Sequence, residues 1–285
     1  MQEGEEVIKN KIIDFAENDD RIRAVVLNGS RANSTILPDK YQDYDILFVV
    51  EKFHSFTENH NWVSFLGNTI IKQLPNEMFN ESDNYCERIS FSYLMIFEDR
   101  NRIDLTLFPK EKFKSDYKED SLTIVWLDKD QLFENIKEAS DLDYRIKAPN
   151  EKDFLDTCNE FWWVSTYVAK GLKREEIFYA KDMLESVVRP MFMKLLEWKI
   201  GVDNDFDISF GKSGKFAKKY LEPNFYKRVL KTYSDSNLGN NWRAFIEMLL
   251  IFKELEIEVS KKLNISAKKI EAKNTLEFIL KIKNE

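Results

Sequence analysis

The sequence predicts an α+β protein of two domains, an N-terminal mixed β-sheet with flanking helices and a C-terminal all-helical bundle. Short apolar runs with strand-like patterns dominate the first half of the 285 residues. Beyond the polar segment Asp141–Asn150, which contains Pro149, the apolar residues recur at helical spacing. We therefore expect a boundary in this segment, with domains at residues 1–148 and 149–285.

The N-terminal half opens with a helical pattern at Val7–Phe15 and a first apolar strand at Ile22–Leu27. The run Tyr44–Val50 is apolar on both faces beyond Asp45, which is typical of a strand in the middle of a sheet. The other elements expected in this half are helices at Phe53–Leu66 and Asp128–Ala139, strands at Asn68–Leu74 and Leu122–Leu127, and a hairpin formed by Ile89–Phe97, the turn Glu98–Asn101 and Arg102–Phe108.

The C-terminal half contains a series of helical patterns. A first helix is expected at Asp153–Lys170 with Gly171 as its end, because glycine commonly follows the last turn of a helix. A second is expected at Glu175–Ile200, kinked or restarted at Pro190. The remaining helices are expected at Lys212–Leu221, Phe225–Thr232, Trp242–Leu263 and Ala267–Ile282.

Composition limits the classes of partner. The formal net charge of −7 argues against a nucleic-acid polymerase, which needs a basic channel, and is compatible with a cationic small molecule. No apolar run approaches the ~20 residues of a membrane span, and the N-terminus has no apolar signal core. Cys86 and Cys158 lie far apart and form no metal or redox motif. We therefore expect a cytoplasmic protein without nucleic-acid or membrane partners.

The most informative stretch joins Asn28-Gly29-Ser30-Arg31 to a second strand that opens with Asp43 and Asp45. Side chains alternate along a strand, so these two acids are expected on the same face. Neighbouring carboxylates repel each other, and Mg²⁺ prefers carboxylate oxygens completed by water and phosphate. Asp104 adds a third acid inside an apolar strand, which indicates a site for two Mg²⁺ ions.

The glycine turn suits a phosphate. Gly29 allows close approach of the backbone, while neighbouring amides and the Ser30 hydroxyl are hydrogen-bond donors. Arg31 adds a planar cationic group for the same phosphate.

These motifs resemble the nucleotidyltransferase superfamily, and within it the aminoglycoside 6-adenylyltransferases. The resemblance covers roughly Asp19–Leu221. The segments that carry it are DDRIRAVVLNGSRAN, PDKYQDYDILFVV, RIDLTLFP, CNEFWWVSTYVAKGL and GKSGKFAKKYL. It implies a nucleotidyltransferase-like sheet domain and transfer of AMP from ATP to the 6-hydroxyl of streptomycin, with release of pyrophosphate and inactivation of the antibiotic.

The resemblance also assigns roles to residues of the N-terminal half. Gly29, Ser30 and Arg31 would hold the triphosphate of ATP. Asp43, Asp45 and Asp104 would be the catalytic carboxylates that bind magnesium.

Residues of the helical half are candidates for the two substrates. Lys170 and Lys215 are expected at the nucleotide, and Glu160, Trp163 and Asp182 at the cationic acceptor, whose guanidinium groups suit acids and aromatic faces. The base that takes the acceptor proton is Asp104, or Glu160 or Asp182 if the site is a cleft between the domains. The chain departs from the family pattern at Asn28, Met183 and Gly214, which bears mainly on the identity of the acceptor.

Two alternatives stay open. One is a nucleotidyltransferase that acts on a protein or an RNA end, against which the acidic balance and the absence of a basic stripe argue. The other is an inactive nucleotide-binding module, which would have no reason to keep three mutually repelling acids. A monomer or a weak homodimer is expected.

Overall fold

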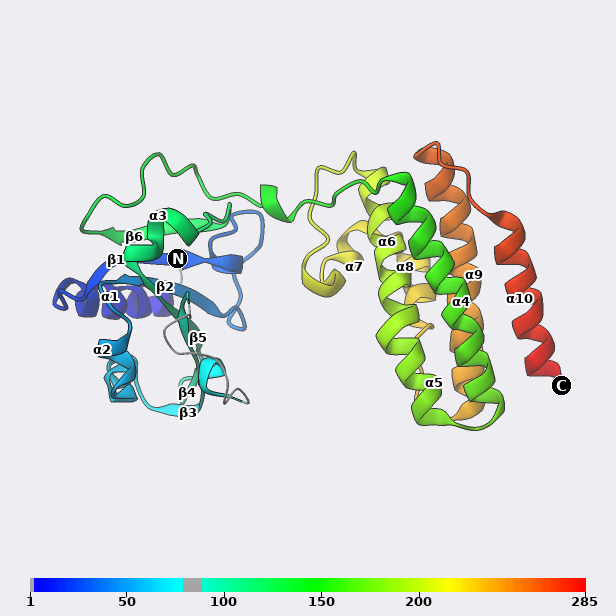
Figure 1. The fold of residues 1–285 in the computed structure, drawn as a ribbon, viewed down its shortest axis with the longest axis horizontal. Coiled ribbons are helices and arrows are strands. Elements are labelled where there is room, and N and C mark those ends of the chain that lie inside the picture. The colour runs from blue at the N-terminus through cyan, green and yellow to red at the C-terminus, as the bar shows by residue number, and fades with distance from the viewer. Residues whose placement is uncertain (1–2, 79–88) are drawn as a thin grey trace. The chain divides into compact units, whose positions relative to one another are not determined.

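The computed structural model describes residues 3–78 and 89–285, and the chain divides into two compact units, Met1–Asp143 and Tyr144–Glu285 (Figure 1). The predicted α+β class is confirmed, because the first unit contains a mixed sheet and the second is helical. The sequence-based boundary between residues 148 and 149 lies slightly beyond this division. Within the described residues, no helix is both long enough and apolar enough to cross a membrane.

The sheet of the first unit has six strands in the order β3-β4-β5-β2-β1-β6. Only the pair β2–β5 is parallel, and the other neighbours are antiparallel. β2 is therefore an inner strand, as its apolar pattern predicted, and β4 and β5 form the predicted hairpin. The bounds are β1 (Ile22–Asn28), β2 (Tyr44–Val50), β3 (Thr69–Gln73), β4 (Phe91–Phe97), β5 (Arg102–Pro109) and β6 (Thr123–Asp128).

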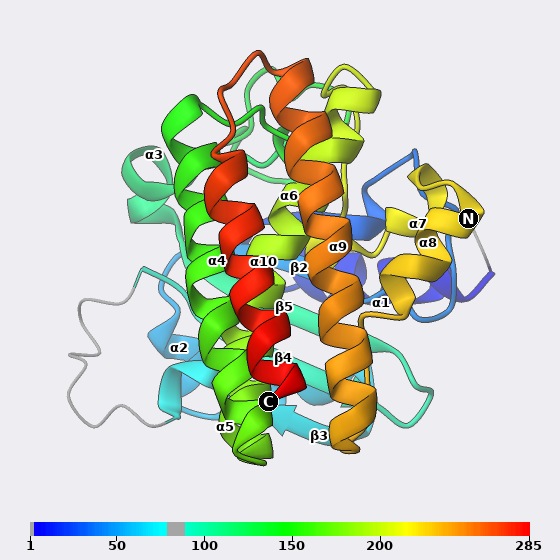
Figure 2. The ribbon, with the colours of Figure 1, turned by 90° about the vertical axis from the view of Figure 1, so that its right-hand side faces the viewer.

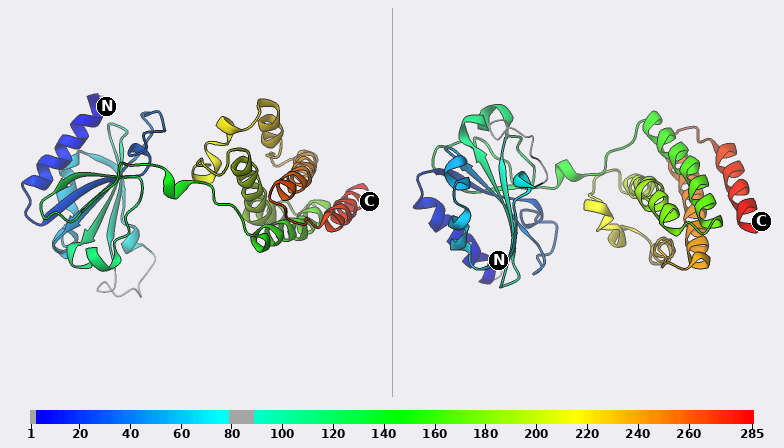
Figure 3. Two further views of the ribbon diagram at one scale, coloured as in Figure 1. Left: turned by 90° about the horizontal axis from the view of Figure 1, so that it is seen from above. Right: turned by 60° about the horizontal axis from the view of Figure 1, so that its bottom comes forward.

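The two faces of this sheet differ. One face carries the larger core and is covered by α1 (Glu3–Glu17) and α2 (His54–Thr57); Figure 3 shows α1 lying along it. The opposite face holds a smaller cluster that includes Leu47 and Phe108, next to α3 (Phe113–Asp116). Because side chains alternate along a strand, the acids at positions 45 and 104 belong to this second, less covered face.

Two helix predictions in the first unit are wrong. The segment 53–66 is not one helix, because the Asn59 side chain accepts a hydrogen bond from the Asn61 amide and starts a separate 3₁₀ helix, His60–Leu66. Residues 128–139 form no helix, because the Asp128 carboxylate accepts hydrogen bonds from the amides of Leu132 and Phe133 and holds the segment in a loop.

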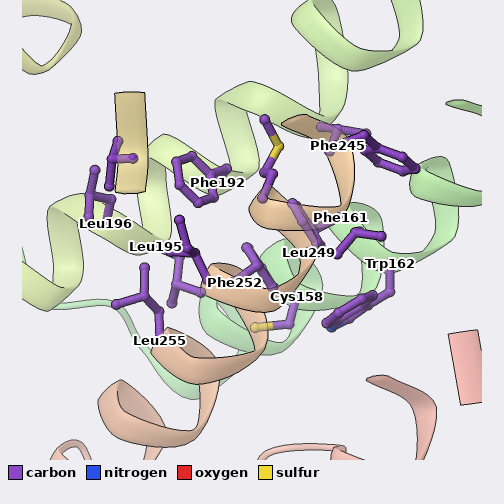
Figure 4. Close-up of a cluster of buried hydrophobic side chains, with 14 of the residues drawn as sticks. Cys158, Phe161, Trp162, Phe192, Leu195, Leu196, Phe245, Leu249, Phe252 and Leu255 are labelled. Carbon is purple, nitrogen blue, oxygen red and sulfur yellow. The ribbon is translucent and has the colours of Figure 1, made fainter. Parts of the chain in front are cut away.

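The second unit is built on long helices that share one core. Figure 2 shows α10 beside α4 and α9, and Figure 4 shows the large side chains that fill the interior, among them Phe161 and Phe252, whose rings stack at 3.5 Å. Cys158 is buried in this core, whereas Cys86 lies outside the described residues. The bounds are α4 (Glu151–Lys173), α5 (Ile177–Met183), α6 (Arg189–Asp203), α7 (Ala217–Tyr220), α8 (Pro223–Leu230), α9 (Leu238–Lys262) and α10 (Lys269–Asn284).

Two features of this unit differ from the expectation or refine it. Gly171 does not end α4 but lies inside it, where a Cβ would meet Tyr179 at 2.9 Å and Ala180 at 3.1 Å. Its lack of a side chain therefore serves helix packing rather than capping. The interruption predicted at Pro190 takes the form of a π-helical turn, Leu184–Val188, which accommodates the missing amide and the bulk of the proline ring.

Candidate active site

The strand register brings the acids of two separate strands together. In the parallel pair β2–β5, Asp45 lies opposite Asp104, and in the pair β1–β2, Asn28 lies opposite Asp45. Register partners on neighbouring strands point to the same face, and neighbouring strands are about 4.8 Å apart. Asp45 and Asp104 are therefore adjacent on the less covered face of the sheet. Asp43 lies just before the first residue of β2, Tyr44.

The turn after β1 packs directly against one of these carboxylates. Gly29 begins a short 3₁₀ helix, Gly29–Arg31, with φ of +73°, a conformation that glycine adopts without strain. A Cβ at this position would overlap Asp45 Oδ2 and lie 3.0 Å from Asp45 Cγ. The Gly29 amide donates to the carbonyl of Leu122, so this amide serves the sheet rather than a phosphate.

Arg31 is held by protein groups. Its guanidinium lies 3.7 Å from the centre of the Tyr44 ring and donates to the Gln42 carbonyl at 2.8 and 3.2 Å. A carboxylate oxygen of Glu5 lies 3.7 Å away, and only 7% of the Arg31 side chain is exposed. These contacts connect the turn after β1 to Gln42 and Tyr44 at the start of β2. The expected contact of Arg31 with a triphosphate stays a prediction, and it requires that some of these contacts break.

Arg102 is a site residue that the sequence reasoning missed. Its Nε donates to Asp104 Oδ1 at 2.9 Å and its Nη2 to Asp104 Oδ2 at 2.7 Å, while Nη1 lies 3.4 Å from Asp43 Oδ2. Hydrogen bonding to Asp104 raises the pKa of Arg102, and the charges of Asp43 and Asp45 raise it further. The sequence contained a pattern that could have identified Arg102, because Arg102 and Asp104 are two residues apart in a strand and therefore share a face.

The candidates of the helical half lie on the surface of the second unit. On α4, Trp163 is 61% exposed and its Nε1 donates to the Tyr167 hydroxyl at 2.8 Å. Lys170 follows on the same helix, 6.0 Å from the Tyr167 ring centre. On α5, the Asp182 carboxylate accepts from Ser186 Oγ at 2.9 Å. Glu160 and Lys215 are also exposed.

Comparison with known proteins identifies the family. A family model described as streptomycin adenylyltransferase matches residues 1–282. The chain belongs to the streptomycin adenylyltransferase family. Among similar proteins, the aminoglycoside 6-adenylyltransferase of Bacillus subtilis (strain 168) is 39% identical, with 91% of each chain covered. The protein of the same name from Campylobacter jejuni is 38% identical and covers 91% of this chain and 89% of its own.

Two further matches carry related names. The aminoglycoside 6-adenylyltransferase of Staphylococcus aureus is 35% identical, with 90% of each chain covered. The solved structure described as an aminoglycoside 6-adenyltransferase from Bacillus subtilis is 32% identical, with 98% of each chain covered and a TM-score of 0.48. The resemblance noted in the sequence is thus confirmed, and the chain is by family an aminoglycoside nucleotidyltransferase.

The family implies ATP as co-substrate, and nucleotide transfer of this kind generally uses Mg²⁺. The carboxylates of Asp45 and Asp104, at paired positions of β2 and β5, suit an ion that takes one or two carboxylates and completes its shell with phosphate and water. Across residues 3–78 and 89–285, no group of three or more His, Cys, Asp or Glu side chains forms a ready-made metal site. The guanidinium of Arg102 bridges two of the predicted ligands, Asp43 and Asp104.

Proposed function

We propose that this protein transfers AMP from ATP to the 6-hydroxyl of streptomycin and releases pyrophosphate. The names of the family and of the similar proteins support an aminoglycoside as acceptor. The observation that carries the chemistry is the register of β2 and β5, which sets Asp45 beside Asp104 next to the Gly29 turn. Two strands thus contribute carboxylates to one place on the sheet, as transfer of a phosphate-linked group requires.

In the proposed reaction, the acceptor oxygen forms a bond to the α-phosphorus of ATP while the bond from that phosphorus to the leaving pyrophosphate breaks. Asp43, Asp45 and Asp104 would hold magnesium, which when bound would screen the charge of the triphosphate and of the leaving group. Asp104 takes the proton of the acceptor hydroxyl, with Glu160 and Asp182 as the other candidate bases.

In this proposal, residues of the sheet unit and residues of the helical unit contact the substrates. The Gly29–Arg31 turn contacts the triphosphate, chiefly through the Ser30 hydroxyl and, once released, the Arg31 guanidinium. Lys170 and Lys215 are the proposed nucleotide contacts on the helical unit. The guanidinium groups of streptomycin match the exposed acids Glu160 and Asp182 in charge and the exposed ring of Trp163 through cation–π contact. The net charge of −7 also favours a cationic acceptor.

The test is an assay with ATP labelled at the α-phosphate, Mg²⁺ and a panel of acceptors. The panel contains streptomycin, an aminoglycoside without a streptidine ring, and bulk RNA and protein. We expect label on streptomycin, one pyrophosphate for each AMP transferred, and attachment at the 6-position by NMR of the product. Label found only on protein or RNA would point to a different acceptor, and nucleotide binding without transfer would point to an inactive module. Either result would overturn the proposal.

A further inference from the structure

Arg102 places a positive charge beside the carboxylates of Asp43 and Asp104. It is the first residue of β5 and lies opposite Ile96 of β4, while Asp104, two positions along, lies opposite Leu94. Its guanidinium binds both oxygens of Asp104, at 2.9 and 2.7 Å, and lies 3.4 Å from an oxygen of Asp43. Such a two-pronged contact fixes the plane of the Asp104 carboxylate as well as neutralising it.

The charges of the site show what this contact does. Arg102 contributes one positive charge beside the acids Asp43 and Asp104 and offsets part of their negative charge. Without the guanidinium, three acids would repel one another at the edge of a sheet face. Arg102 therefore offsets part of this repulsion, whereas the strand register sets the spacing of Asp45 and Asp104.

The same contact also opposes metal binding. Both oxygens of Asp104 already accept hydrogen bonds from Arg102, so an ion that binds this carboxylate either takes a remaining lone pair beside the guanidinium or replaces one of these bonds. A guanidinium and a divalent ion that share one carboxylate lie about 5 Å apart, and in water their repulsion weakens ion binding by about tenfold. The side chains of Arg102 and Asp104 are 44% and 21% exposed, so a water-like screening of this repulsion applies.

We propose that Arg102 is a positioning residue that competes with the metal ion for Asp104, so that the ion binds tightly only together with ATP. The inference rests on the proposed function, because it takes the three carboxylates as the metal ligands. The phosphates of ATP supply further ligands for the ion and further acceptors for the guanidinium, so that the ion replaces the guanidinium at Asp104. Free divalent ions thereby bind about tenfold more weakly at the site without nucleotide.

The test measures binding of Mn²⁺ to the full-length protein without nucleotide, by electron paramagnetic resonance of the free ion. Arg102→Gln should bind Mn²⁺ about tenfold more tightly than the wild type, and Arg102→Lys, which keeps the charge, should restore most of the wild-type value. Arg100→Gln is the matched control, because it removes the same charge from the same hairpin and its side chain has no ion pair with any described residue. It should leave Mn²⁺ binding unchanged.

Unchanged or weaker Mn²⁺ binding by Arg102→Gln, with a wild-type circular dichroism spectrum, would overturn the inference. Absence of Mn²⁺ binding by both the wild type and Arg102→Gln would also overturn it. A merely structural role of Arg102 would weaken binding, not strengthen it. The readout involves no AMP transfer. Tighter binding by Arg102→Gln together with failure of the transfer assay would therefore support this inference and reject the proposed function.

Discussion

Replacement of Gly29 by alanine tests how closely the turn and the carboxylate depend on each other. At φ of +73°, an alanine costs about 1–2 kcal/mol of stability through its Cβ. The added methyl would overlap Asp45 Oδ2, so the carboxylate must move by about 1 Å to restore normal contact distances. A displacement of this size at a reacting centre lowers the rate by about 100-fold. We therefore expect a modest loss of stability and a large loss of activity.

The assay compares kcat/KM for AMP transfer with the unfolding free energy from urea titration. Gly4→Ala is the matched control, because Gly4 lies in α1 with nothing within 4 Å of an added Cβ. Alanine favours the helix there, so this variant should be as stable as the wild type or up to about 1 kcal/mol more stable, with unchanged activity. Gly29→Ala with wild-type kcat/KM would refute the reasoning, because the methyl group could then be accommodated without moving Asp45.

Three further predictions concern one residue each. Asp43→Asn should lower kcat by about 100-fold or more without changing the unfolding free energy measurably, because its side chain is 39% exposed; retained turnover would count against its role as a ligand. Phe252→Ala should cost about 3–5 kcal/mol in urea unfolding, because the ring is fully buried; a cost below about 1 kcal/mol would mean that the core repacks. Burial raises the pKa of Glu256 above the ordinary value of 4.5, although the hydrogen bond from Trp162 opposes this, so the wild type loses stability as pH rises through the raised pKa. Glu256→Gln should match the wild type at low pH and exceed its stability at higher pH; parallel pH profiles of the two unfolding free energies would contradict this.

The strands of the sheet and the acidic residues within them were predictable, because an apolar run and an acid that interrupts it are both visible in a short stretch of sequence. Tyr44–Val50 is apolar on both faces, and the structure makes it an inner strand with these bounds. Asp104 stood out for the same reason, as an acid in an apolar strand. That it lies directly opposite Asp45 was not predictable, because register depends on pairing between strands distant in sequence.

The failures share a cause, in that a side chain bonded to the backbone or packed against a neighbour overrode the pattern. Asp128 holds its following segment in a loop by accepting backbone hydrogen bonds, although the apolar spacing there resembles a helix. Gly171 had the sequence signature of a helix end, but it lets α5 approach α4. Arg102 was missed because an arginine directly after the turn of a hairpin is normally solvated. The structure shows its contacts with Asp43 and Asp104.

The proposed metal site of β2 and β5 is tested most directly by single-turnover transfer of AMP to streptomycin by Asp45→Asn and Asp104→Asn. Each variant keeps the shape of the side chain and removes one charge from the register pair. We expect transfer to slow by about 1000-fold or more in both, with ATP binding in excess Mg²⁺ weakened in both. If either variant transfers AMP at a rate within about tenfold of the wild type, the two carboxylates do not act together and the account is contradicted.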